Sequence, residues 1–216
     1  MASDSNSGSD NGSKSAKLHK MIATKDIEIR AALHEKKLSV FRDAPDTIVI
    51  DELGLSHAKV RIDVAVINGC VHGYEIKSSL DTLDRLPAQL HLYSQCLEML
   101  TIVCAPKHLD NVTNSAPTWC GVVEAKKGKR GAVTFSTVRK ASTNPEINAV
   151  QLAHLLWRPE ALALLTQLGV TEKTSKLSRK ELYVLIAERL SIKQLTVAIR
   201  ESMRLRRAWR DPQVHA

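Results

Sequence analysis

Three charged residues lie in two short apolar segments joined by a turn, in the stretch RIDVAVINGCVHGYEIKS (residues 61–78). Asp63 is in the first segment, and Glu75 and Lys77 are in the second. Strands at the centre of a parallel sheet normally read as nearly unbroken Val, Ile and Leu. Two carboxylates beside a lysine are instead the minimal set for metal-assisted phosphodiester hydrolysis, because carboxylate oxygens bind Mg²⁺ and the metal polarises the phosphate.

Each of these residues has an expected role in that chemistry. Asp63 and Glu75 would hold Mg²⁺, for which Mn²⁺ could substitute, and the backbone carbonyl of Ile76 would be a further ligand. Lys77 would orient or deprotonate the attacking water and balance the charge of the pentacovalent phosphate. The strand period of two places Glu75 and Lys77 on one face and Ile76 on the other. The alternative is that these charges form surface salt bridges on a half-exposed hairpin.

The register of the hairpin decides whether the two carboxylates can meet. With a simple two-residue Asn-Gly turn, Asp63 would lie opposite Tyr74, and Glu75 would point to the wrong face. The carboxylates converge only if the loop holds an odd number of residues or a bulge intervenes, and Gly73 could host such a bulge. We therefore predict a shifted hairpin.

Hydrophobic patterning predicts the elements that would position this hairpin. A helix capped by Thr24 is expected over 21–39, and a helix capped by Asp84 over 84–99. The pattern from residue 146 onward is helical to the end of the sequence. Strands are expected at 47–55, 60–67, 70–78, 101–106, 119–125 and 132–138. The predicted fold class is α/β, with a mixed central β-sheet flanked by helices and a helical C-terminal lobe.

Composition divides the chain into three parts. Residues 1–20 are a Ser, Gly, Asn and Asp tract that is expected to be disordered, residues 21–141 form the α/β core, and residues 142–216 form a basic helical lobe. No run approaches the roughly 20 apolar residues that span a bilayer, and the N-terminus has no apolar signal segment. The four cysteines form no CxxC pair. A cytoplasmic protein without a membrane partner is expected.

The chain carries a formal net charge of +8, which favours a polyanionic partner. Residues 147–216 contain twelve Lys or Arg and six Asp or Glu, so they carry a net +6 of that charge. The C-terminal lobe is therefore a candidate phosphate-contacting surface.

The ordered combination D-x(11)-E-x-K, formed by Asp63, Glu75 and Lys77, resembles the core motif of the PD-(D/E)XK nuclease superfamily. Gln89 and Tyr93 in the following helix match the Q-h-x-x-Y motif (h, apolar) of its RecB-like and lambda-exonuclease-like branch. The block from Arg61 to Tyr93 also resembles a family of small, largely uncharacterised bacterial proteins placed in this superfamily. The resemblance implies a bacterial or phage protein with a restriction-endonuclease-like core that acts as a Mg²⁺-dependent nuclease. Gln89 and Tyr93 would help to position the active site and the DNA backbone.

Many members of that superfamily supply a further acidic residue from upstream of the hairpin. Glu28 and Glu35 in the first helix are candidates, as is Glu52 at the end of the preceding strand. Glu52 ranks first because it follows an apolar run and could reach the same strand ends. A solvated carboxylate is the alternative for all three and the preferred interpretation for Glu28 and Glu35.

Basic residues outside the motif are candidates for contacts to a nucleic-acid backbone. Their alternatives are helix capping for Arg85, a solvated loop for the KKGKRG turn, and exposure to water for the last helix. Aromatic residues make up only 4% of the chain, so no stacking platform for single strands is expected. The candidates are Arg85, Lys126, Lys127, Lys129, Arg130, Arg204 and Arg207.

The sequence thus favours a nuclease that acts on DNA, with RNA left open. One alternative is a nucleic-acid-binding module in which the same fold is catalytically silent. Another is a protein-interaction module that binds a partner through the helical tail.

Overall fold

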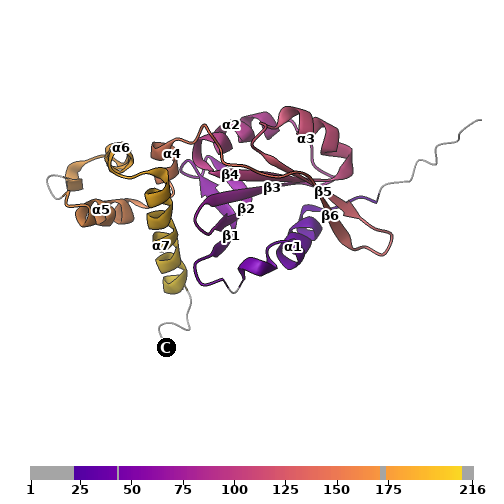
Figure 1. The fold of residues 1–216 in the computed structure, drawn as a ribbon, viewed down its shortest axis with the longest axis horizontal. Helices are drawn as coiled ribbons and strands as arrows, with labels where there is room; N and C mark the ends of the chain where they lie inside the picture. Colours follow the sequence, from indigo (N-terminus) through magenta and orange to yellow (C-terminus); the bar gives the residue numbers. More distant parts are fainter. Residues whose placement is uncertain (1–21, 43, 171–173, 211–216) are drawn as a thin grey trace, which may run out of the picture.

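The computed structural model describes residues 22–42, 44–170 and 174–210, without the side chains of residues 207–210. The predicted disordered tail, residues 1–20, lies outside the described residues. A six-stranded mixed sheet has helices α2 and α3 on one face and helix α1 on the other, as Figure 1 shows. Helices α4 to α7 form a lobe at one end of the sheet. The predicted α/β class and helical C-terminal lobe are confirmed.

The strands follow one another across the sheet in chain order. Pairs β1–β2, β2–β3 and β5–β6 are antiparallel, whereas β3–β4 and β4–β5 are parallel. A parallel pair needs a crossover connection, and helices α2 and α3 supply the two crossovers. The strands are β1 (Ile48–Leu55), β2 (Val60–Ile67), β3 (Val71–Lys77), β4 (Met99–Cys104), β5 (Gly121–Lys127) and β6 (Val133–Arg139).

The helices differ from the prediction mainly at their ends. Helix α3 was not predicted, because its seven residues, LDNVTNS, are mostly polar and too few to show a helical period. None of the described helices has the length and apolarity to cross a membrane. The helices are α1 (Asp26–Lys36), α2 (Leu86–Cys96), α3 (Leu109–Ser115), α4 (Ala149–Ala153), α5 (Arg158–Gln167), α6 (Arg179–Arg189) and α7 (Ile192–Arg210).

Two predicted helix caps were wrong. Thr24 precedes helix α1 but does not cap it; its hydroxyl accepts a hydrogen bond from the Ser79 amide (3.0 Å) and ties the chain to the segment after β3. Helix α2 begins after Arg85, not after Asp84. Pro87 lies in the first turn of α2, where its missing N–H has no helical acceptor to lose.

Each face of the sheet has its own hydrophobic core. Under α1, Ile29 and Leu33 pack against Val64 and Val66. The core on the α2 face continues into the C-terminal lobe. Burial of each such side chain contributes about 1.5–3 kcal/mol, so the shared core holds the lobe to the sheet. Members of the shared core include Leu90, Leu97 and Ile102 from the sheet side and Leu152, Leu165, Leu195 and Ile199 from the lobe.

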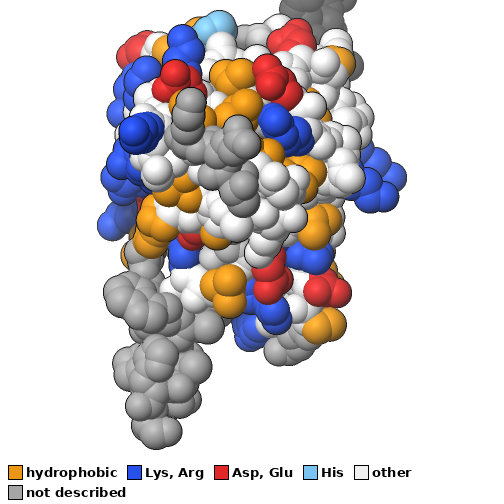
Figure 2. Space-filling view, turned by 90° about the vertical axis from the view of Figure 1, so that its left-hand side faces the viewer, with side chains coloured by type: hydrophobic (Ala, Val, Ile, Leu, Met, Phe, Trp, Pro, Cys, Tyr) orange, Lys and Arg blue, Asp and Glu red, His pale blue; other side chains and the backbone are white. Residues whose placement is uncertain are grey.

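Figure 2 looks onto the end of the molecule that the helical lobe forms. Lys and Arg side chains are scattered over this face, with acidic and hydrophobic side chains between them. The positive charge is therefore spread over the lobe and is not confined to one helix.

Candidate active site

The hairpin of β2 and β3 has the shifted register that the sequence predicted. Ile67 pairs with Val71, which leaves a three-residue loop, and Val64 pairs with Tyr74. Asp63 and Glu75 occupy the next positions in this register and therefore lie opposite each other across the two strands.

Of the two ways to shift the register, a bulge at Gly73 is not the one used, because the pairing from Val64–Tyr74 to Ile67–Val71 is continuous. The odd loop alone produces the shift. Gly73 has a packing role instead, since a Cβ at this position would lie 2.6 Å from Cδ1 of Leu97. The absence of a side chain lets Leu97 pack directly on the strand.

Strands β2 and β3 separate at these carboxylates. Pairing between them ends at Val64–Tyr74, although β2 stays paired with β1 and β3 stays paired with β4. The amide of Ile76 therefore has no partner on β2, and Oδ2 of Asp63 accepts its hydrogen bond at 2.6 Å. The predicted role of Ile76 concerned its carbonyl, which stays a prediction.

Glu75 and Lys77 form a buried ion pair. The side chains of Glu75 and Lys77 are 3% and 7% exposed, and Nζ of Lys77 lies 2.7 Å from Oε1 of Glu75. An exposed pair would be the surface salt bridge of the alternative interpretation, which burial contradicts. Removing each of these two charged groups from water costs several kcal/mol. The close hydrogen bonds between them must therefore offset that cost, because burial by itself is unfavourable for charged groups.

Helix α2 supplies two further side chains to Glu75. Gln89 donates to Oε1 of Glu75 (2.8 Å) and accepts from Nζ of Lys77 (2.9 Å). The Tyr93 hydroxyl donates to Oε2 of Glu75 at 2.6 Å. Burial, and then the negative charge of Glu75, raise the pKa of Tyr93 above its ordinary value, so the hydroxyl stays a donor. Gln89 and Tyr93 thus both contact Glu75 and orient its two oxygens, whereas their roles in positioning an active site and DNA stay predictions.

Asp63 has a basic partner that nothing in the sequence pattern singled out. Arg30 of α1 lies 3.1 Å from Oδ1 of Asp63 and donates to its backbone carbonyl at 2.8 Å. Burial, and then the charge of Glu75, nevertheless raise the pKa of the Asp63 carboxyl above its usual range. The two carboxylates therefore repel each other across the separated strands.

Of the three upstream acids, Glu52 is connected to Asp63. It lies opposite Asp63 in the β1–β2 register, has a positive φ of 56°, and is 2.7 Å from Arg30, which bridges the two residues. Glu28 is instead paired with Lys127 at 2.5 Å, and Glu35 is exposed.

Asp63 and Glu75 are the carboxylates that would hold a Mg²⁺ ion, from adjacent strands and with incomplete protein ligation. Burial, and then the charge of Glu75, raise the pKa of Asp63, and a divalent cation would offset the second of these effects. Within the described residues, no group of three or more His, Cys, Asp or Glu side chains could hold a metal ion. The remaining ligands would have to be main-chain, water or substrate oxygens, which is usual for Mg²⁺.

The predicted phosphate-contacting residues do not gather at this site. Arg85 is exposed at the start of α2 without a capping bond. Arg204 pairs with Glu201, and the Arg207 side chain lies outside the described residues. Lys126, Lys129 and Arg130 are exposed where β5 turns into β6, at the sheet edge opposite β1.

Comparison with known proteins relates the sequence of this chain to one protein family. The family model described as Bacteriophage P4 protein cII matches residues 21–211, which include both the sheet and the helical lobe. The "Protein cII" of Enterobacteria phage P4 is 33% identical over 150 residues, covering 69% of this chain and 56% of that protein. The chain therefore spans about half the length of this curated relative. No solved structure matches the chain.

Proposed function

Since the chain belongs to the bacteriophage P4 protein cII family, whose name states no chemistry, we propose a function from the site itself: a Mg²⁺-dependent nuclease that hydrolyses phosphodiester bonds in DNA. The observation that carries the proposal is the meeting of Asp63 and Glu75 where β2 and β3 separate, with Lys77 bonded to Glu75. Burying two opposed carboxylates and an ammonium group is unfavourable for stability alone, and such arrangements are concentrated at functional sites.

In this proposal the protein side chains around Asp63 and Glu75 orient the metal ligands, the attacking water and the phosphate. Bound Mg²⁺ would polarise the scissile phosphate. An ammonium group has three N–H donors, and Lys77 uses two of them on Glu75 and Gln89. The third has no partner among the described residues and would hold an attacking water or a phosphate oxygen. Gln89 and Tyr93 keep the Glu75 carboxylate in one orientation, and Arg30 does the same for Asp63.

Cleavage assays test the proposal directly. Linear, circular and single-stranded DNA, and single-stranded RNA, are incubated with the protein in Mg²⁺ or Mn²⁺. Asp63→Asn and Lys77→Ala should each reduce the rate by about 10²–10⁴-fold. Asp46→Asn and Lys140→Ala are matched controls, because both residues are exposed and lie outside the site. Absence of cleavage by the wild-type protein, or equal cleavage by the site variants, would refute the nuclease.

One observation favours a second function, a catalytically silent nucleic-acid-binding or protein-interaction module. Lys77 already pairs with Glu75, and Arg30 with Asp63, in the absence of a metal. A silent site of this kind would keep the same melting temperature when Mg²⁺ or Mn²⁺ is added. A nuclease site should gain stability from the ion, and Asp63→Asn should abolish that gain.

A further inference from the structure

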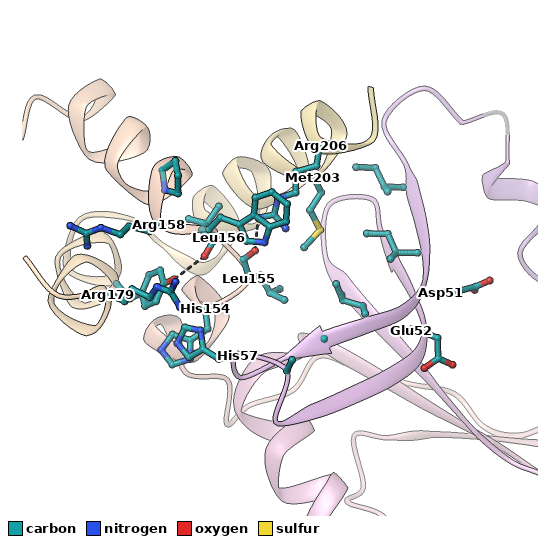
Figure 3. Close-up of a pocket in the computed structure, with 18 of the residues that line it drawn as sticks. Asp51, Glu52, His57, His154, Leu155, Leu156, Arg158, Arg179, Met203 and Arg206 are labelled. Carbon is teal, nitrogen blue, oxygen red and sulfur yellow. Dashed lines mark hydrogen bonds between the residues drawn. The ribbon is translucent and has the colours of Figure 1, made fainter. Parts of the chain in front are cut away.

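A cavity of about 1010 Å³ lies between strand β1 and the helical lobe, as Figure 3 shows. One wall is β1, which is an edge strand of the sheet. The other wall consists of the starts of α5 and α6 and one side of α7. The volume is at the upper end of the range for ligand sites, so the cavity has room for more than one nucleotide unit.

The two carboxylates of the β1 wall have partners on the other side of the strand. Asp51 is 2.7 Å from His34, and Glu52 is 2.7 Å from Arg30. In Figure 3 these two carboxylates lie at the far side of β1 from the lobe.

The lobe wall carries three arginines: Arg206 is paired with Glu160, whereas no acidic side chain among the described residues pairs with Arg158 or Arg179. Arg158 donates to the carbonyls of Leu177 (2.6 Å) and Ser175 (2.7 Å), which hold the guanidinium without removing its charge. Arg179 is exposed at the first position of α6. The net positive charge of this wall therefore comes from Arg158 and Arg179.

Aromatic rings from the lobe and from the β1–β2 turn also line the cavity. The ring of His57 is 4.3 Å from that of His154, which lies 4.9 Å from the ring of Tyr183. Trp157 is 48% exposed and has the guanidinium of Arg206 stacked 4.2 Å from its ring centroid. The low aromatic content of the sequence predicted no stacking platform for single strands. The fold nevertheless brings together rings that are more than 100 residues apart in the chain, such as those of His57 and Tyr183.

We propose that this cavity binds single-stranded nucleic acid, with bases stacked on Trp157 and His57 and phosphates at Arg158 and Arg179. The inference rests on the proposed nuclease function and specifies its substrate class. Aromatic faces favour unpaired bases, because the bases of a duplex are already stacked on one another. An extended peptide added to the free edge of β1 would not need two unneutralised arginines beside exposed rings, so nucleic acid is favoured.

Binding is measured by fluorescence anisotropy with a fluorescein-labelled oligothymidylate in EDTA, which prevents cleavage. Arg158→Ala/Arg179→Ala should weaken binding by at least about tenfold. It should also reduce the slope of log K against log salt by about 1.4, the value for two lost single-strand phosphate contacts. Lys37→Ala/Lys140→Ala removes the same charge at two exposed positions outside the cavity and should change the affinity less than twofold. Equal losses in the two double variants would overturn the proposal.

Substitutions of Trp157 distinguish the contribution of base stacking to binding from that of charge. Trp157→Ala should weaken binding by about tenfold with an unchanged salt slope, and Trp157→Phe should recover most of the affinity because it keeps a ring. No loss with Trp157→Ala, or equally tight binding of duplex DNA of the same length, would overturn the cavity as a single-strand site. So would a wild-type protein that does not bind the oligothymidylate, and a peptide at the edge of β1 would then be the occupant to test.

Failure of the nuclease proposal gives a different pattern of results. Asp63→Asn should bind the oligothymidylate as tightly as the wild type, because Asp63 does not line the cavity. Binding that depends on the cavity residues, without cleavage, would refute the nuclease and keep the cavity. Cleavage that survives Arg158→Ala/Arg179→Ala with unchanged KM would refute the cavity and keep the nuclease.

Discussion

Removal of Lys77 tests whether the site is held by its buried ion pair. In Lys77→Met the Glu75 carboxylate stays 3% exposed but loses the ammonium group 2.7 Å from its Oε1. At an effective dielectric constant of 20, two unit charges 4 Å apart interact by about 4 kcal/mol. Deletion of one partner of a buried pair typically costs about 3–5 kcal/mol. We therefore expect Lys77→Met to lower the free energy of unfolding by about 3–4 kcal/mol, since Gln89 and Tyr93 still donate to Glu75.

The double variant Glu75→Gln/Lys77→Met completes the cycle. It has no uncompensated charge, so it should recover most of the stability that Lys77→Met loses, with a coupling energy of at least about 2 kcal/mol. Urea unfolding in EDTA, followed by circular dichroism, measures all four proteins. Arg204→Met is the matched control, because the Arg204–Glu201 pair has the same 2.7 Å separation but is largely exposed, and it should show no measurable loss. Additive effects in the cycle would refute a buried, mutually dependent pair.

Three further predictions concern the framework of the site. Gly73→Ala should destabilise the protein by about 1–3 kcal/mol in urea unfolding, because the new Cβ would lie 2.6 Å from Leu97, and a result within experimental error would contradict the close packing. Glu98→Ala should lower the free energy of unfolding by about 2–3 kcal/mol in the same assay. The buried Glu98 carboxylate accepts hydrogen bonds from the Thr196 hydroxyl of α7 (2.6 Å) and from a β3 amide (2.8 Å). Thr196→Val removes only one of these bonds and should lower the free energy of unfolding by about 1 kcal/mol. Burial lowers the pKa of His72 from 6.5 to about 4, so its contribution to stability is complete above pH 6.5 and is lost as the pH falls toward 4. The shift amounts to about 3 kcal/mol, and the urea midpoint of His72→Gln should fall less than that of the wild type between pH 7 and 4.5.

The register of the hairpin was predictable because side chains alternate between the two faces of a strand. Two charged residues on facing strands can share a face only with an odd loop or a bulge, so the positions of Asp63 and Glu75 in the chain are enough to require the shift. The sequence could not decide between those two solutions. The structure has the odd loop, with residues 68–70 between the paired strands and no bulge from Val64–Tyr74 to Ile67–Val71.

Arg30 and the ring cluster were missed for a related reason. Arg30 follows Asp26 by four residues, which in sequence reads as an ordinary helical ion pair, and its contacts with Glu52 and Asp63 exist only once α1 packs on the sheet. His57 and His154 carry no local pattern at all. Spacing identifies side chains that share one element, whereas a site between elements depends on tertiary packing.

The separation of β2 from β3 explains why the candidate site could be recognised from charged residues in central strands. Where two strands stay paired, each backbone amide has a partner and the side chains between them are packed. Beyond Val64–Tyr74 the pairing stops, and the Asp63 carboxylate takes the place of the missing strand by accepting the Ile76 amide. An apolar residue at position 63 would leave that amide unsatisfied, so the same carboxylate both completes the backbone hydrogen bonding and faces Glu75. Asp63→Asn, which keeps an acceptor oxygen, should therefore be folded and suited to separate chemistry from stability, whereas Asp63→Ala should lose both.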